Sequence, residues 1–362
     1  MVRRSFRLLG SLMLLGVIVM GGSILVARWR WTHGLTVQLT PVLTWETHNV
    51  GSRIVEFTPD AAFVATQDDG HVAQVTLKRL TDSTPGLTFQ APGDHISAVT
   101  IDPTGEWLAA ICRERMICIW TLKDAHLLGM IEPPLHDNSP FSFRFGPQPT
   151  QIQVVQADLV TRWHVPRLTR THQVMLQPFP SGALPDAGLA ISAQGTYVAK
   201  HTRSGTVYLW DGQTGAPLIT LTAHTDWVTE LAFSPDEQVL ATASYDRTIR
   251  IWHLPEGRLR HTITTIGESA LAFSPDGTLL ASGDGQEAGS HGLRGNSYVF
   301  LWDTRTGARV GRTEILHRKQ DGFMNAVRFS ANGQLLGSTD TDGIKLRHDT
   351  LDTYGTIAVA AM

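Results

Sequence analysis

Cysteine is nearly absent from this 362-residue sequence, which contains only Cys112 and Cys118. Two cysteines are too few for a disulfide framework, and the Cys-x-x-Cys spacing with which many zinc sites begin does not occur. The two residues flank a predicted strand-turn-strand hairpin. We expect them to remain unpaired thiols, since such neighbours more often stay free than form a disulfide.

An excess of one charge is also lacking, because Lys and Arg number 30 against 33 Asp and Glu, for a formal net charge of -3. Without a basic field or a run of Lys and Arg, a nucleic-acid partner is not expected. The 15 histidines form no His-Glu-x-x-His or similar cluster. Residues 338–343 resemble the start of a calcium loop but lack its distant Glu, and the glycine-rich segment 283–288 is followed by no helix. We therefore predict no metal and no cofactor.

The longest apolar run, residues 8–27, contains no charged residue. At about 1.5 Å per residue, a helix of this length crosses a hydrocarbon core of about 30 Å. We predict a short tail at residues 1–7, a transmembrane helix at 8–27, a linker at 28–35, and a repeat domain at 36–362. The alternative is a cleaved signal peptide, whose apolar region is usually shorter, about 7–15 residues.

Charges around the predicted span favour one orientation. Arg3, Arg4 and Arg7 precede it together with the terminal amine, whereas Arg28 and Arg30 follow it. Positive charge is retained on the cytoplasmic side of a membrane. We therefore expect a single-pass protein whose larger domain, a monomer, lies on the periplasmic or extracellular side.

The remainder of the chain is one unit repeated. The clearest unit, residues 223–252, divides into three short strands separated by turn signals, and residues 217–222 supply a fourth strand. Seven units align on the same turn at intervals of 40 to 56 residues. They are FTPDAAFVA from Phe57, IDPTGEWLA from Ile101, FGPQPTQIQ from Phe145, ISAQGTYVA from Ile191, FSPDEQVLA from Phe233, FSPDGTLLA from Phe273 and FSANGQLLG from Phe329.

These units resemble those of the WD-repeat family, whose period is about 40–45 residues and whose units end in Trp-Asp. The resemblance implies an all-β fold, a seven-bladed β-propeller with four strands per blade, placed after the transmembrane helix. The third strands are expected to end at Val75, Trp120, Trp163, Trp210, Trp252, Trp302 and Arg347, so five units keep the tryptophan.

Closure of such a ring requires a strand that joins its two ends. Residues 36–46 are expected to supply the outer strand of the last blade, beside residues 344–347. Residues 356–361 are equally strand-like, and the sequence leaves both possibilities open.

In the clearest unit the resemblance implies a structural tetrad of His224, Thr242, Asp246 and Trp252. A buried indole needs an acceptor for its N–H, which a hydroxyl backed by His and Asp supplies. A catalytic triad is the alternative for the same residues. It is disfavoured because a nucleophile must be exposed, whereas this threonine should lie beneath the tryptophan.

With no catalytic residues predicted, the expected function is a membrane-tethered, non-catalytic scaffold that binds a protein or peptide on a propeller face. Residues 283–297 form an insertion that is either a tolerated loop or a binding finger. The candidate partner-binding residues are of types that dominate interface energy. They are Arg113, Glu114, Arg203, Trp227, Tyr245, Arg247, His291 and Arg294. The alternative is a propeller-type hydrolase or oxidoreductase with a site at the central channel, where Glu230 and Arg328 are the charged candidates.

Overall fold

A computed structural model of the chain shows an all-β fold with almost no helix. Among the described residues, helix is limited to one 3-10 turn, Val165–Arg167. The structure describes residues 19–20, 23–24, 37–39, 41–47, 56–66, 74–81, 85–93, 96, 98–112, 116–133, 141–148, 150–179, 188–265, 269–285, 296–313, 317–318, 324–341, 345–347, 350–352 and 355–361.

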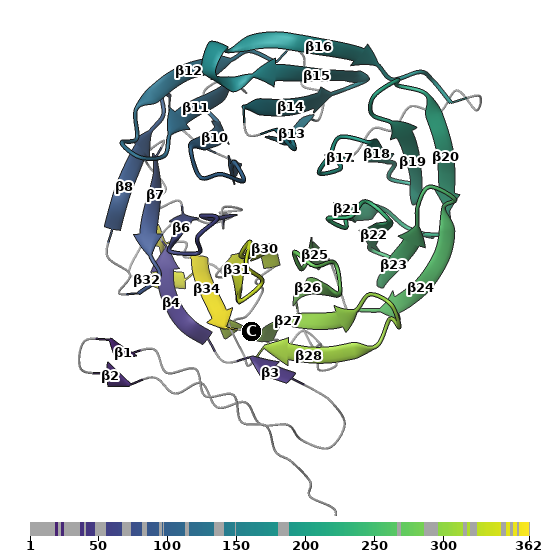
Figure 1. Ribbon diagram of the computed structural model, residues 1–362. Coiled ribbons are helices and arrows are strands. Elements are labelled where there is room, and N and C mark those ends of the chain that lie inside the picture. Colours follow the sequence, from purple (N-terminus) through teal and green to yellow (C-terminus); the bar gives the residue numbers. More distant parts are fainter. Residues whose placement is uncertain are drawn as a thin grey trace, which may run out of the picture.

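The strands form antiparallel sheets that stand around a central axis as a propeller (Figure 1), with each repeat unit running from the inside of the ring to the outside. Five sheets of four strands come from consecutive stretches of chain. They are β5 (Glu56–Phe57), β6 (Phe63–Thr66), β7 (Gln74–Arg79) and β8 (Pro85–Gln90); β9 (Val99–Ile101), β10 (Trp107–Ile111), β11 (Ile117–Thr121) and β12 (Leu127–Ile131); β13 (Phe141–Phe145), β14 (Gln151–Gln156), β15 (Leu159–His164) and β16 (Thr169–Met175); β17 (Leu189–Ile191), β18 (Tyr197–His201), β19 (Thr206–Asp211) and β20 (Pro217–Thr222); and β21 (Val228–Phe233), β22 (Val239–Ser244), β23 (Thr248–His253) and β24 (Arg258–Thr264).

The two remaining sheets of the ring take strands from distant parts of the chain. A six-stranded sheet contains β25 (Ser269–Phe273), β26 (Leu279–Gly285), β27 (Asn296–Asp303), β28 (Arg309–Thr313), β29 (His317–Arg318) and β3 (Val37–Leu39). A further four-stranded sheet contains β30 (Met324–Phe329), β31 (Leu335–Thr341), β34 (Gly355–Ala361) and β4 (Pro41–Thr47). The expectation of seven four-stranded blades is thus corrected, because six sheets have four strands and the sheet of the sixth unit has six.

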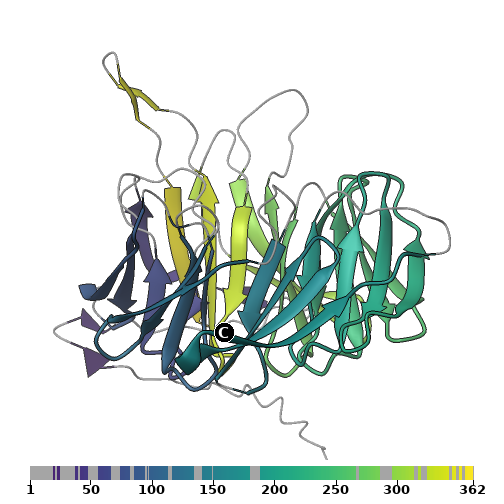
Figure 2. The ribbon, with the colours of Figure 1, turned by 90° about the horizontal axis from the view of Figure 1, so that it is seen from above.

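Both candidate closing segments are used, and in different ways. Strand β34 pairs with β31 as the third strand of the last sheet, and β4 pairs with β34 as its outer strand. Strand β3 pairs in parallel with β28 of the neighbouring sheet, so the segment 36–46 is divided between two sheets. Residues 345–347 were expected in the third position but instead form β32, which pairs only with β33 (Thr350–Asp352) in a separate hairpin that Figure 2 shows projecting from the ring.

The strand register corrects the expected ends of two third strands. In the fifth sheet Leu240 of the second strand faces Trp252 of the third. The residues that align with Leu240 in the first and last sheets face Lys78 and Ala360. These residues, rather than Val75 and Arg347, therefore stand where the other units have tryptophan. Neither could be placed by spacing, because more residues separate the second and third strands of these two sheets than in the clearest unit.

The aligned turn recurs because its side chains hold its backbone. In the fifth unit the Ser234 hydroxyl accepts a hydrogen bond from the Val239 N–H at 2.9 Å, and Asp236 accepts one from the Gln238 N–H at 3.1 Å. Glu237, which lies between Asp236 and Gln238, has a φ of 58°, in the left-handed region that favours glycine. Gly277 occupies the equivalent position in FSPDG of the next unit.

The apolar core lies between neighbouring sheets. One buried cluster joins Ile249 and Ile251 of the fifth sheet to Leu280, Phe300 and Trp302 of the next. Further clusters lie between other adjacent sheets, such as the one that joins the second and third. Because each sheet covers the face of its neighbour, stability depends on contacts around the whole ring.

Cys112 and Cys118 form a disulfide, with their Cα atoms 5.9 Å apart. The expectation of free thiols was therefore wrong. Both residues are fully buried, Cys112 directly after β10 and Cys118 in β11, and the antiparallel pairing of these strands brings the two backbones within the range that a disulfide requires.

Most of the predicted transmembrane segment, residues 8–27, lies outside the described residues. Its described part consists of β1 (Val19–Met20) and β2 (Ser23–Ile24), which pair antiparallel where a helix was expected. A Gly-Gly pair separates them in the sequence, and such a pair favours a turn between strands. Within the described part of the chain, no helix is long and apolar enough to cross a membrane.

The arrangement predicts how truncation affects stability. Deleting residues 1–48 removes β3 and β4 and leaves β34 with an unpaired edge, whereas deleting residues 1–30 leaves both strands in place. We expect the longer deletion to melt at least about 5 °C below the shorter one, which corresponds to a loss of roughly 2 kcal/mol. Circular dichroism on both forms measures the difference, and equal melting temperatures would contradict the closing role of β4.

Candidate functional site

A chain of hydrogen bonds joins the four tetrad residues of the fifth unit. His224 precedes β21, Thr242 lies in β22, Asp246 lies in the turn after it, and Trp252 lies in β23. The indole N–H of Trp252 donates to the Thr242 hydroxyl at 3.0 Å. His224 Nε2 lies 2.6 Å from the same hydroxyl, and His224 Nδ1 lies 2.8 Å from the Asp246 carboxylate.

The protonation states follow from the environment. Burial lowers the pKa of His224 and outweighs the opposing hydrogen bond to Asp246. Burial opposes ionisation of Asp246 too, but hydrogen bonds from the Thr248 hydroxyl and His224 lower its pKa overall. A neutral imidazole that donates from Nδ1 to Asp246 accepts at Nε2 from Thr242, so every donor in the chain has an acceptor.

This network is closed to a substrate. The Thr242 side chain is fully buried, and Trp252 and His224 are 4% and 7% exposed. A catalytic nucleophile needs access to its substrate, which this hydroxyl lacks. The arrangement is therefore suited to holding the turn and strands of the unit together.

Other units satisfy their indoles differently. Trp302 donates to the Ser282 hydroxyl at 2.9 Å, and the register shows that Ser282 stands where Thr242 stands in the fifth unit. Trp120 and Trp210 donate instead to the backbone oxygens of Gln90 and Gln177, at 3.3 and 2.8 Å. Ser282 was not among the predicted tetrad residues, although aligning the second strands of the two units identifies it as the equivalent of Thr242.

Three of the predicted partner-binding residues form one cluster, which we call the Trp227 cluster: Arg203, Trp227 and Tyr245. The Arg203 guanidinium lies 5.4 Å from the centroid of the Trp227 ring. The Tyr245 ring lies 5.6 Å from that of Trp227 with an interplanar angle of 60°. Arg203 comes from the turn between β18 and β19, so the cluster spans two neighbouring sheets.

Tyr245 is 40% exposed, and Arg203 is exposed as well. Arg247 lies at the same β22–β23 turn, is exposed, and adopts the left-handed region with a φ of 64°. The predicted residues Arg113, Glu114, His291 and Arg294 lie outside the described residues. The structure thus brings together part of the predicted face, in the form of two aromatic rings and one cation.

A central cavity of about 520 Å³ is lined by the innermost strands of all the sheets in the ring. Its charged residues are Glu56, Arg144, Glu230 and Arg328. Of these four, only Glu230 and Arg328 were predicted from the sequence. Arg328 Nε lies 3.7 Å from the Glu56 carboxylate. Burial raises the pKa of Glu56 to about 7, against the opposing charges of Arg328 and Arg144.

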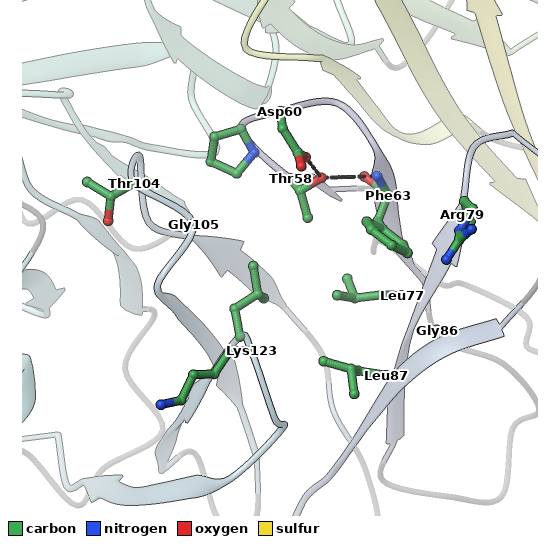
Figure 3. Close-up of a pocket in the computed structure, with 12 residues that line it drawn as sticks. Thr58, Asp60, Phe63, Leu77, Arg79, Gly86, Leu87, Thr104, Gly105 and Lys123 are labelled. Atoms are coloured by element: carbon green, nitrogen blue, oxygen red, sulfur yellow. Dashed lines mark hydrogen bonds between the residues drawn. The ribbon is translucent and has the colours of Figure 1, made fainter.

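A second cavity, of about 460 Å³, lies between the first and second sheets (Figure 3). Phe63, Leu77 and Leu87 form an apolar wall, while Arg79 and Lys123 lie at separate positions on the rim. Asp60 accepts hydrogen bonds from Thr58 and from the Ala62 N–H, which lower its pKa. Its mixed lining contains no set of groups that points to one chemistry. No group of three or more His, Cys, Asp or Glu residues suited to a metal occurs in the described residues.

Three segments of the chain are similar to one known protein family. Residues 83–121, 215–253 and 259–303 match the family described as "WD domain, G-beta repeat". Each segment contains the first three strands of one sheet together with the outer strand of the sheet before it.

Several curated proteins are similar over parts of the chain. The mouse (Mus musculus) periodic tryptophan protein 2 homolog is 29% identical over 42% of this chain and 16% of that protein. The mouse target of rapamycin complex subunit LST8 is 25% identical over 55% of this chain and 61% of that protein. Autophagy-related protein 16 of Arabidopsis thaliana is 28% identical over 46% of this chain and 30% of that protein. The chain thus matches less than two thirds of each relative. Together with the repeats, these matches support a WD-repeat β-propeller family.

The tetrad generates a stability prediction. We expect Trp252→Ala to lower the free energy of unfolding by about 3–5 kcal/mol, because it removes a large buried side chain. Thr242→Val should cost about 2 kcal/mol or more, because it leaves the indole N–H and His224 Nε2 without their partner. Urea denaturation measures both.

Thr222→Val is the matched control, since Thr222 is exposed on the outer strand β20, and it should change the free energy of unfolding by less than about 0.5 kcal/mol. A Thr242→Val variant as stable as this control would show that the network does not hold the fold.

Proposed function

We propose that this chain, whose repeats match those of WD-repeat β-propellers, is a non-catalytic scaffold that binds a protein partner through the Trp227 cluster. The observation that carries the proposal is that an exposed tyrosine and an arginine, from two adjacent sheets, both contact the same tryptophan ring. These three residue types dominate the binding energy of protein interfaces.

The cluster is already ordered before a partner binds. The Tyr245 N–H donates to the Trp227 backbone oxygen at 2.9 Å, so the backbones of the two aromatic residues are held together. A side chain that is held in position loses little entropy on binding, which favours affinity. The tetrad adjoins the cluster in the chain, since Asp246 follows Tyr245 in the same turn.

The proposal includes a membrane tether at residues 8–27. Its support is the uncharged run of that length and the arginines on both sides of it. We further propose that the propeller lies on the periplasmic or extracellular side. The Cys112–Cys118 disulfide supports this side, because disulfides persist in oxidising compartments and are rare in the cytosol.

An enzyme with a site at the central channel is the second candidate, and the Glu56 carboxyl, with a pKa raised to about 7, is the observation in its favour. Ser142 and Thr100 supply hydroxyls to the same cavity, but no histidine or cysteine is present among its described lining residues to activate them. We therefore propose binding rather than turnover, with the propeller as a monomer.

The binding surface is tested by substitution in the full-length chain. Proteins captured by the wild type after crosslinking in cells provide the partner, whose affinity is then measured for Tyr245→Ala, Trp227→Ala and Arg203→Ala. We expect each substitution to weaken binding by about 10-fold or more. Met175→Ala is the control, since Met175 is 61% exposed on the outer strand β16, away from the cluster. Equal affinity for all four variants would place the partner elsewhere.

Orientation is tested with protease. Added to intact cells or right-side-out vesicles, protease should digest the propeller domain, because the domain is expected outside the cytosol. Immunoblotting with an antibody against the domain follows the digestion. Full protection before lysis, with digestion only afterwards, would place the propeller in the cytosol.

A further inference from the structure

The charged residues of the central cavity share one level of the ring. The register pairs Glu56 with Ala65, Arg144 with Gln153 and Arg328 with Gly337, and these pairs are equivalent positions in their sheets. The innermost strands therefore place one residue each at this level. Taken in order around the ring, these residues are Glu56, Thr100, Arg144, Ala190, Ala232, Ala272 and Arg328.

This level has two unlike sides. Arg328, Glu56, Thr100 and Arg144 come from adjacent sheets and make one wall of the cavity polar and charged. The other wall has alanine at the same level in three successive sheets. Because alanine side chains are short, the space in front of the two guanidinium groups is left open to a ligand.

The two arginines are only partly satisfied by the protein. Arg328 has a side chain 45% exposed; its Nη1 donates to the Val327 backbone oxygen, and its Nε lies 3.7 Å from Glu56. Arg144 donates from Nη1 to the Ile191 backbone oxygen at 3.2 Å, while its Nε is buried without a hydrogen-bond partner among the described residues. Guanidinium groups bind carboxylates and phosphates through several N–H donors at once, so these two retain donors for an oxyanion.

We propose that the central channel binds the carboxylate or phosphate group of a ligand between Arg328 and Arg144, with the Thr100 hydroxyl beside it. This site is separate from the Trp227 cluster and does not depend on it. The ligand enters along the axis of the ring and faces the alanine wall with its less polar part.

Glu56 controls the charge of this site. Strand β5 packs against β6, β9 and β30, and among the residues of these strands Arg328 is the charged one. Arg144 and Glu230 face the same cavity from β13 and β21. Burial raises the pKa of Glu56 to about 7, so Glu56 loses its negative charge as the pH falls below that value. An anion then meets both arginines without the opposing charge of Glu56, and binding should strengthen at lower pH.

The test uses sulfate, which stays divalent between pH 5.5 and 8.5. Isothermal titration of the full-length protein in detergent, at constant ionic strength, should show binding that is about 10-fold or more tighter at pH 5.5 than at pH 8.5. Glu56→Gln should bind tightly at both pH values, because the amide resembles the neutral acid. Arg328→Gln should weaken binding about 10-fold or more at both.

Arg258→Gln is the matched control, because Arg258 is exposed on the outer strand β24, and it should bind sulfate like the wild type. Acetate and methyl phosphate, titrated in parallel, distinguish a carboxylate ligand from a phosphate ligand. A circular dichroism spectrum that matches that of the wild type would show that Arg328→Gln folds normally. The proposal would be overturned by a folded Arg328→Gln variant whose affinity for sulfate equals that of the wild type. It would also be overturned by a Glu56→Gln variant whose affinity for sulfate still depends on pH as in the wild type.

Discussion

Neighbouring sheets must cover one another, and the rest of this structure depends on that constraint. The buried clusters lie between adjacent sheets, so a sheet at an open end of the row would leave an apolar face in water. The chain meets the constraint by closing the ring with segments from both ends of the sequence. Strands β4 and β34 share the last sheet, and β3 joins the sheet beside it.

Much of this fold could be predicted from the sequence, because the aligned turn is a local structure that its own side chains stabilise. Ser234 and Asp236 hold their turn through hydrogen bonds to residues a few positions away, so the same letters mark the same turn in each unit. Pairing across long loops could not be predicted in this way. Spacing alone placed Val75 and Arg347 opposite the second strands, whereas long-range register places Lys78 and Ala360 there.

The candidate sites differ in the same way in how far they could be predicted from the sequence. The tetrad and the Trp227 cluster were accessible from sequence, because each consists of residues at fixed offsets from the recurring turn. The charged level of the central channel was not, since Glu56, Arg144 and Arg328 are far apart in the sequence and meet only through the circular order of the sheets. The disulfide depended on the separation of two backbones at the end of a hairpin, which composition does not reveal.

The last sheet also has a consequence for how the protein is made. Strand β4 is synthesised before strands β5 to β31, yet its partner β34 is synthesised after them. During translation, the sheets in between can fold one against the next while β4 has nothing to pair with. Such pairing between distant segments is slow and leaves strand edges exposed for a time. A newly made chain is therefore most vulnerable to aggregation in the interval before β34 is synthesised.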